Sequence, residues 1–144
     1  MSLATTNYNL SECISLSKHS EQRQKSDRQN QLTDFSYLKE ISMGDDKMIE
    51  NIIQLFLQKT PIKLKQLQQA VKTKDWAKVY HLAHALKSSM RLIGVNPQIN
   101  HFASIEYVAL HRKDLKTIPF LLQKSTAICI AIISELQQLD KLIY

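Results

Sequence analysis

A histidine and two cations share one face of a predicted helix near the middle of the 144-residue chain. In the segment AHALKSSMRLIG, residues 83–94, Lys87 follows His84 by three positions. Ser88 and Arg91 follow the histidine by four and seven positions. Residues at these spacings lie on the same side of an α-helix. Cations beside an imidazole disfavour its protonated form, so they favour the neutral, nucleophilic ring.

The same cations would stabilise an anion attached to His84. One pair of unit charges at about 4 Å, with an effective dielectric constant of about 20, contributes up to about 4 kcal/mol before solvent screening. A phosphoryl group on the imidazole is the natural candidate, because Lys87 and Ser88 can supply donors to its oxygens. The small side chain of Ser88 also leaves room for a second protein to approach the ring. The spacing therefore favours a phosphoacceptor histidine.

The buried face of this helix decides whether His84 reaches solvent. At about 100° per residue, the apolar residues of the helix fall within an arc of roughly 100°. These residues are Val79, Leu82, Ala83, Leu86, Met90 and Ile93. His84 lies close to the opposite side of the helix, among Tyr80, His81, Lys87 and other polar side chains. We therefore expect His84 to be exposed rather than packed in the core.

An apolar patch for a partner protein is predicted beside the histidine. Ala85 and Leu92 flank the histidine face and lie away from the centre of the core stripe, and Tyr37 from an earlier helix would extend the patch. The predicted partner-binding residues on this helix are Tyr80, His81, Ala85, Arg91 and Leu92. A substitution of Leu92 that weakens partner binding should leave the folded protein stable.

The pattern of the whole chain predicts helices. Only two glycines and three prolines occur, and so few backbone breakers favour long helices. Apolar residues recur at helical spacing over about 34–42, 46–72, 76–93, 97–110 and 117–141. Pro61 either kinks the second helix or restarts it at Thr60; Asp75 is a suitable N-cap for the third helix, and Gly94 is its stop. We predict an all-α fold, an antiparallel four-helix bundle with a short additional N-terminal helix.

Two regions of different composition divide the chain. Residues 1–32 are polar and aperiodic and predict a tail or linker, which leaves residues 33–144 as one domain. The formal net charge of +6 suits acidic partners in general. No block of basic residues is interleaved with aromatic residues, so nucleic-acid binding is not expected.

Membrane spans and cysteine chemistry are not indicated either. The most apolar stretch, residues 117–134, is interrupted by Gln123 and Lys124 and does not predict a membrane segment. Cys13 lies in the polar tail and Cys129 in an apolar helix, which fits neither a disulfide framework nor a cysteine metal site. A reduced, cytoplasmic compartment is the simplest expectation.

A metal site and a hydrolytic active site are the two alternatives to a phosphoacceptor histidine. His81 and His84 form an H-x-x-H pair to which His101 or His111 could add a metal ligand. Lys87 would repel a cation there, so no metal site is predicted. The sequence contains no glycine-rich phosphate loop, no nucleophile elbow and no paired carboxylates near His84 that could act as acid and base. A hydrolytic enzyme is therefore not expected.

The segment AHALKSSMRLIG resembles the phosphoacceptor motif of histidine phosphotransfer (HPt) domains. That motif reads roughly A-H-x-L-K-G, with a further glycine ten residues after the histidine. The positions that match are Ala83, His84, Leu86, Lys87 and Gly94. Ser88 departs from the pattern, because the family most often has glycine there. The similarity extends over about residues 34–141.

The resemblance implies a phosphocarrier of two-component phosphorelays without catalytic activity of its own. His84 would exchange a phosphoryl group with an aspartate of a receiver domain, and Lys87 would balance the transferred charge. The implied partners are a response regulator receiver domain and a sensor histidine kinase, either separate or in the same parent chain. No cofactor is expected in this chain, since Mg²⁺ would be held by the receiver, and a monomer is the default expectation.

One alternative function stays open at the level of sequence. A helical interaction module would keep the same bundle and dock a receiver or kinase without phosphotransfer. The exposed histidine and the cation one turn after it distinguish the two functions, and both features are present. We therefore favour phosphotransfer on His84.

Overall fold

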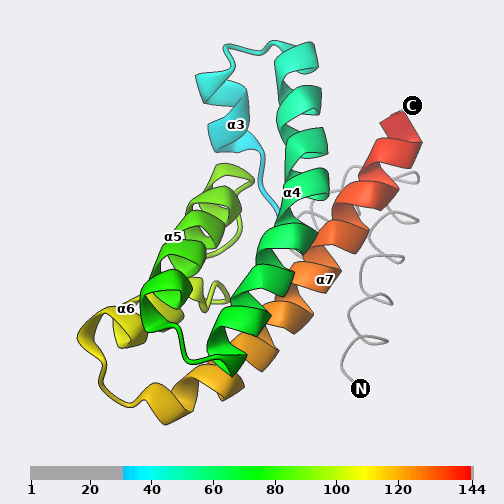
Figure 1. Cartoon of the computed structure of the whole chain (residues 1–144). Coiled ribbons are helices and arrows are strands. Elements are labelled where there is room, and N and C mark those ends of the chain that lie inside the picture. Colours follow the sequence, from blue (N-terminus) through cyan, green and yellow to red (C-terminus); the bar gives the residue numbers. More distant parts are fainter. Residues whose placement is uncertain (1–30, 144) are drawn as a thin grey trace.

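The computed structural model describes residues 31–143, and these residues form helices and turns with no strand among them. The helices are α3 (Ser36–Ile41), α4 (Asp46–Lys72), α5 (Trp76–Leu92), α6 (Phe102–His111) and α7 (Ile118–Ile143), with the 3₁₀ helix η1 (Leu115–Thr117) before α7 (Figure 1). The predicted polar tail, apart from its last two residues, and Cys13 lie outside the described residues.

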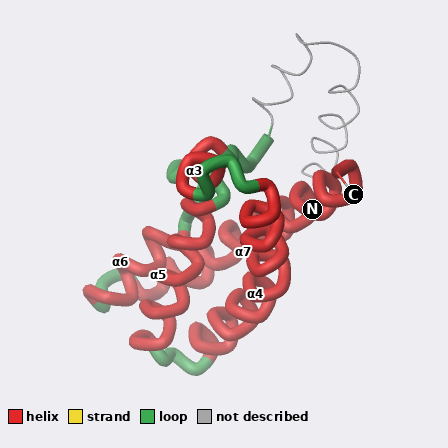
Figure 2. Tube along the Cα trace, turned by 90° about the horizontal axis from the view of Figure 1, so that it is seen from above, coloured by secondary structure: helices red, strands yellow, loops and turns green. Residues whose placement is uncertain are grey.

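Helices α4 to α7 form a bundle in which each helix runs antiparallel to the one before it. Helix α5 packs against α4 and α6, and α7 closes the bundle by packing against the same two helices (Figures 1 and 2). The short helix α3 lies beside the N-terminal part of α4, above the C-terminal end of α5 (Figure 1). The predicted all-α, antiparallel four-helix bundle with a short N-terminal helix is confirmed.

One continuous core contains side chains from all four long helices. From α5 the fully buried members are Val79, Ala83, Leu86 and Met90, with Ile93 directly after the helix. They recur every three or four residues, as a helix that buries one face requires. The predicted apolar stripe is confirmed, and its one half-buried member, Leu82, packs against the core. The polar face of α5 is consequently turned outward.

The ends of α5 are defined by an aspartate and a glycine. Asp75 is the N-cap, and its side chain accepts a hydrogen bond from the backbone N–H of Lys78 at 3.2 Å. Gly94 follows the helix with φ = +76°, a conformation that side chains disfavour. A Cβ atom on Gly94 would lie 1.7 Å from the carbonyl oxygen of Asp34. Both predicted boundary residues are thus confirmed, and the glycine also permits a close backbone approach.

Helix α4 continues through Pro61 without interruption. The structure therefore settles the question that the sequence left open, since no second helix begins at Thr60. A proline in a helix removes one backbone hydrogen bond, but burial of the surrounding apolar face offsets this loss. Phe56 and Leu64, on either side of the proline, are both buried in the core.

The predicted start of the fourth helix at Pro97 is wrong, because α6 begins at Phe102. Two asparagines explain the difference. The side chain of Asn96 accepts a hydrogen bond from the N–H of Gln98 at 2.9 Å, and Asn100 accepts one from Phe102 at 3.2 Å. Such side-chain bonds to the backbone stabilise turns in competition with a helix.

The segment Leu115–Leu139, which runs from η1 into α7, is long and apolar enough to resemble a membrane span by length and composition. In the bundle, however, one face of this segment supplies Leu122, Ile132 and Leu136 to the core. A core helix of a bundle meets the same compositional test, so this feature is weak evidence for a span. Cys129 is also buried on this face, and burial raises the pKa of its thiol to about 12.

Candidate functional site

His84 lies at the middle of α5 and its side chain is 57% exposed. The residue before it, Ala83, is fully buried, as is Leu86 two positions later. The prediction that His84 reaches solvent is therefore confirmed. The exposure follows from the helical pattern, because its neighbours occupy the opposite, buried face.

A carboxylate that was not predicted from the sequence, Glu106, lies beside His84 and Lys87. Glu106 extends from α6 toward the polar face of α5, and its side chain is only 13% exposed. One carboxylate oxygen, Oε2, accepts a hydrogen bond from Nδ1 of His84. The other, Oε1, accepts one from Nζ of Lys87 at 2.6 Å. A single residue from the neighbouring helix thus connects the histidine and the lysine.

Opposing effects determine the charge of Glu106. Desolvation by burial raises the pKa of its carboxyl group. The hydrogen bonds and charges of Lys87 and His84 together outweigh desolvation, so the pKa lies below its ordinary value of 4.5. Glu106 is consequently ionised at neutral pH.

An ionised carboxylate accepts hydrogen bonds but cannot donate them, so Nδ1 of His84 must carry the hydrogen. In the neutral imidazole the lone pair is then on Nε2. Among the described residues, none forms a hydrogen bond with Nε2. The Tyr80 ring flanks the imidazole in a stacked arrangement, with 6.2 Å between the centroids. Glu106 therefore selects the tautomer whose nucleophilic nitrogen is free.

Lys87 is less exposed than its place on the polar face of α5 predicts. Its side chain is 24% exposed, because the ammonium group is drawn to Glu106. An ammonium group has three donors, and this contact uses one of them. Two donors are available for an anion at the histidine, so the structure is compatible with the predicted role of Lys87 in balancing transferred charge.

Ser88 is exposed on the turn after His84, as its position predicts. Its hydroxyl donates a hydrogen bond to the backbone carbonyl of His84 at 3.1 Å. A hydroxyl has one hydrogen, so in this conformation Ser88 does not direct a donor toward the imidazole. Its small size leaves space beside the ring.

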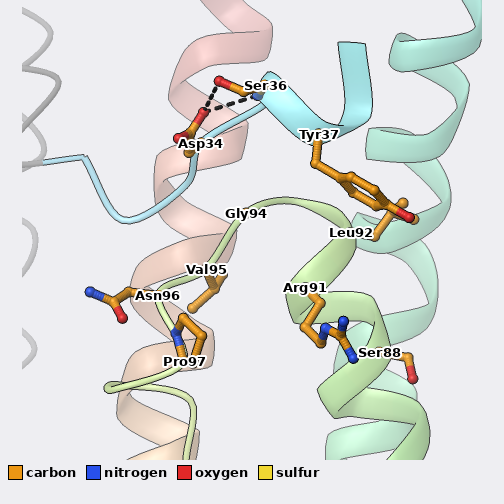
Figure 3. Close-up of a pocket in the computed structure, with 10 residues that line it drawn as sticks. All are labelled: Asp34, Ser36, Tyr37, Ser88, Arg91, Leu92, Gly94, Val95, Asn96 and Pro97. Atoms are coloured by element: carbon orange, nitrogen blue, oxygen red, sulfur yellow. Dashed lines mark hydrogen bonds between the residues drawn. The ribbon is translucent and has the colours of Figure 1, made fainter. Parts of the chain in front are cut away.

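A groove of about 710 Å³ lies between α3, the C-terminal part of α5 and the loop after it. Ser88, Arg91 and Leu92 line one side, and Tyr37 of α3 extends toward Leu92 from the other (Figure 3). We call this feature the α3–α5 groove. It brings two predicted partner-binding residues, Arg91 and Leu92, together with Tyr37.

The other predicted partner-binding residues lie outside the α3–α5 groove. His81 is exposed, and its ring meets the edge of the half-buried Tyr80 with centroids 5.2 Å apart. Both residues lie one turn before His84. Ala85 is half-buried and does not line the groove. The predicted surface is therefore divided into parts on either side of the histidine.

Glu106 carries a sequence signal that we overlooked. In the α6 segment FASIEYVALH it is the one acidic residue among mostly apolar positions. An acidic side chain that packs between helices usually has a hydrogen-bond or charge partner. Only the packing of α6 on α5 shows that the partners of Glu106 are His84 and Lys87. In the described part of the chain, no group of three or more potential metal ligands was found.

Comparison with known proteins identifies the family. A family model described as "Hpt domain" matches residues 51–141, which is more than half of the chain. The chain belongs to the Hpt domain family. The match includes α5 with His84 and α6 with Glu106, whereas α3 precedes it. Comparisons with curated proteins and with solved structures found no match.

Membership of the Hpt family indicates a general role in two-component phosphorelays. Hpt domains in general are phosphocarriers rather than catalysts, and they interact with receiver domains and kinases. The helical bundle described above is the fold expected of this family.

Proposed function

We propose that this Hpt domain carries a phosphoryl group on Nε2 of His84 and exchanges it with an aspartate of a receiver domain. One observation supports this role above the others. Glu106 binds Nδ1 of an exposed histidine, which leaves the lone pair of Nε2 directed away from that contact. The chain acts as a carrier, with no catalytic activity of its own.

In the proposed step the lone pair of Nε2 attacks the phosphorus of an aspartyl phosphate. A nitrogen–phosphorus bond forms, the phosphorus–oxygen bond breaks, and the electron pair leaves with the aspartate carboxylate. The ring keeps its Nδ1 hydrogen and so gains positive charge, which the carboxylate of Glu106 stabilises. Transfer to a receiver reverses these changes. The chemistry requires positioning and electrostatic stabilisation rather than a catalytic base.

The neighbours of His84 would serve the phosphoryl group and its donor. Lys87 has two remaining N–H donors for the phosphoryl oxygens, and the small Ser88 leaves space for the receiver to approach. The receiver supplies the aspartate and the Mg²⁺ ion, so no cofactor is assigned to this chain. We place the reaction in the cytoplasm, with the Hpt domain as a monomer and with a sensor histidine kinase, separate or in the same parent chain, as a further partner.

The test is transfer from a phosphorylated receiver domain in the presence of Mg²⁺, with His84→Gln as the matched variant. We expect acid-labile, base-stable phosphate on the wild-type protein and none on the variant, because a phosphoramidate bond to imidazole is hydrolysed in acid. Circular dichroism of both proteins provides the folding control. A folded wild-type protein that takes no label from several receivers would instead favour the interaction module.

A further inference from the structure

A buried carboxylate on α7, Glu135, lies outside the site described above. The residue is 1% exposed. Its Oε1 accepts a hydrogen bond from the backbone N–H of Leu32 at 2.8 Å. Its Oε2 accepts hydrogen bonds from the backbone N–H of Thr33, at 2.9 Å, and from the Thr33 hydroxyl. These hydrogen bonds connect α7 to residues 32–33, which precede α3 and lie about a hundred positions earlier in the chain.

The same segment is held at a second point, where α5 ends. The N–H of Asp34 donates to the carbonyl of Ile93 at 3.2 Å. Gly94 allows this approach, because a side chain there would collide with the Asp34 backbone. The Asp34 carboxylate in turn accepts hydrogen bonds from the N–H and hydroxyl of Ser36, at 2.9 and 2.6 Å (Figure 3). The contacts of residues 32–36 therefore determine where α3 begins.

Helix α3 forms one wall of the α3–α5 groove. Its Tyr37 is 54% exposed and extends toward Leu92 (Figure 3). The opposite wall includes Ser88, one helical turn after His84. A shift of α3 would change the width of the groove. It would leave the imidazole in place, because the contacts that orient His84 come from α5 and α6.

Burying the carboxyl group of Glu135 has a desolvation cost that an apolar side chain at this position would not have. Burial raises the pKa of this group, and the hydrogen bonds from residues 32–33 oppose that effect only in part. Burial of a polar group is favourable only where hydrogen bonds compensate for the loss of water. Among the described residues, the hydrogen bonds of Glu135 all go to residues 32–33. Its distinctive contribution is therefore the position of that segment.

We propose that Glu135 is a positioning residue for phosphotransfer, which holds residues 32–33 on α7 and thereby keeps α3 in place as a wall of the docking groove beside His84. This inference rests on the proposed function, since the occupant of the groove is the receiver domain that exchanges the phosphoryl group. The groove suits that partner because it is continuous with the histidine face through Ser88. Glu135 itself would touch neither the receiver nor the phosphoryl group.

The test uses the whole chain and two phosphoryl donors. A phosphorylated receiver with Mg²⁺, supplied at increasing concentration, reports docking and chemistry together. Phosphoramidate, a small donor that needs no docking groove, reports the reactivity of His84 alone. For Glu135→Gln, we expect the receiver concentration at half-maximal transfer to rise at least fivefold. Labelling by phosphoramidate and the maximal transfer rate should stay within twofold of wild type.

Variants of Thr33 provide a second test that leaves the core of α7 unchanged. Thr33→Val removes the hydroxyl donor and should raise the half-maximal receiver concentration, whereas Thr33→Ser keeps a hydroxyl and should behave like wild type. Asp114→Asn removes a carboxylate charge at the exposed turn between α6 and α7 and serves as the charge control. If Glu135→Gln does not fold, the Thr33 pair decides.

Amide hydrogen exchange adds a structural readout. In Glu135→Gln the amides of residues 32–41 should exchange faster, while those of α5 and α6 keep their protection. The positioning role would be overturned if Glu135→Gln and Thr33→Val both reached half-maximal transfer at the wild-type receiver concentration. It would also be overturned if the variants lost labelling equally with the receiver and with phosphoramidate. Neither result would contradict phosphotransfer on His84. A wild-type protein that accepts no phosphoryl group from any receiver would overturn the proposed function, and this inference with it.

Discussion

Replacing Glu106 with glutamine should slow phosphotransfer by about tenfold. The substitution preserves the shape of the side chain and an oxygen that can accept the Nδ1 hydrogen of His84, but it removes the negative charge. A hydrogen bond to a charged group contributes roughly 1.5–3 kcal/mol, and one between neutral groups contributes roughly 0.5–1.5 kcal/mol. The difference of about 1 kcal/mol is lost in the resting protein, where the charge of Glu106 favours the Nδ1–H tautomer, so a smaller share of the His84 rings is in the reactive form in the variant.

The developing charge on the ring increases this loss. An unscreened pair of charges about 4 Å apart would interact by about 4 kcal/mol at an effective dielectric constant of 20. His84 is 57% exposed, so solvent reduces the interaction toward the value for surface pairs, at most about 1 kcal/mol. Lys87, released from Glu106, recovers part of the loss at the phosphoryl group. A net loss of about 1.4 kcal/mol corresponds to the tenfold decrease in rate.

The assay is single-turnover transfer from a phosphorylated receiver at saturating concentration, with Asp114→Asn as the control for loss of one negative charge. Nitrogen-15 NMR of the imidazole provides an independent readout. The wild-type ring should be the Nδ1–H tautomer, whereas glutamine, which can donate or accept, should allow both tautomers. A transfer rate within twofold of wild type, together with an unchanged tautomer, would refute the role assigned to Glu106.

Two further predictions concern stability. Gly94→Ala should destabilise the protein by about 3 kcal/mol in thermal or urea denaturation. The reason is that φ of Gly94 is positive and the new Cβ atom would collide with the backbone of Asp34. A loss of stability below about 1 kcal/mol would show that the segment around Asp34 is easily displaced. Glu106 should make stability depend on pH with a defined sign. Folding lowers the pKa of the Glu106 carboxyl group, so near pH 4.5 and below the unfolded chain binds more protons than the folded protein. The stabilisation from ionised Glu106 is therefore present above about pH 4.5. It is lost as the pH falls through the pKa of Glu106 in the folded protein. The difference in melting temperature between wild type and Glu106→Gln should therefore shrink below about pH 4.5, and a constant difference would contradict the ion-pair assignment.

Local rules in the sequence were sufficient for most of the fold. The three- and four-residue spacing of apolar side chains predicted the helices, because burial of one face imposes that period. Asp75 and Gly94 marked the ends of α5, since capping and positive φ are properties of the adjacent backbone. The start of α6 was mispredicted because competing side-chain bonds from Asn96 and Asn100 to the backbone outweighed the preference of Pro97 for a first helical turn.

The sequence by itself also predicted that His84 points away from the core, because the apolar positions of α5 fix which face of that helix is buried. The tertiary structure decided what surrounds the ring. Glu106 reaches His84 across 22 positions of the chain, and Glu135 reaches Thr33 across 102. Such contacts depend on how one helix packs against another, and helical periodicity within a single segment contains no information about that packing.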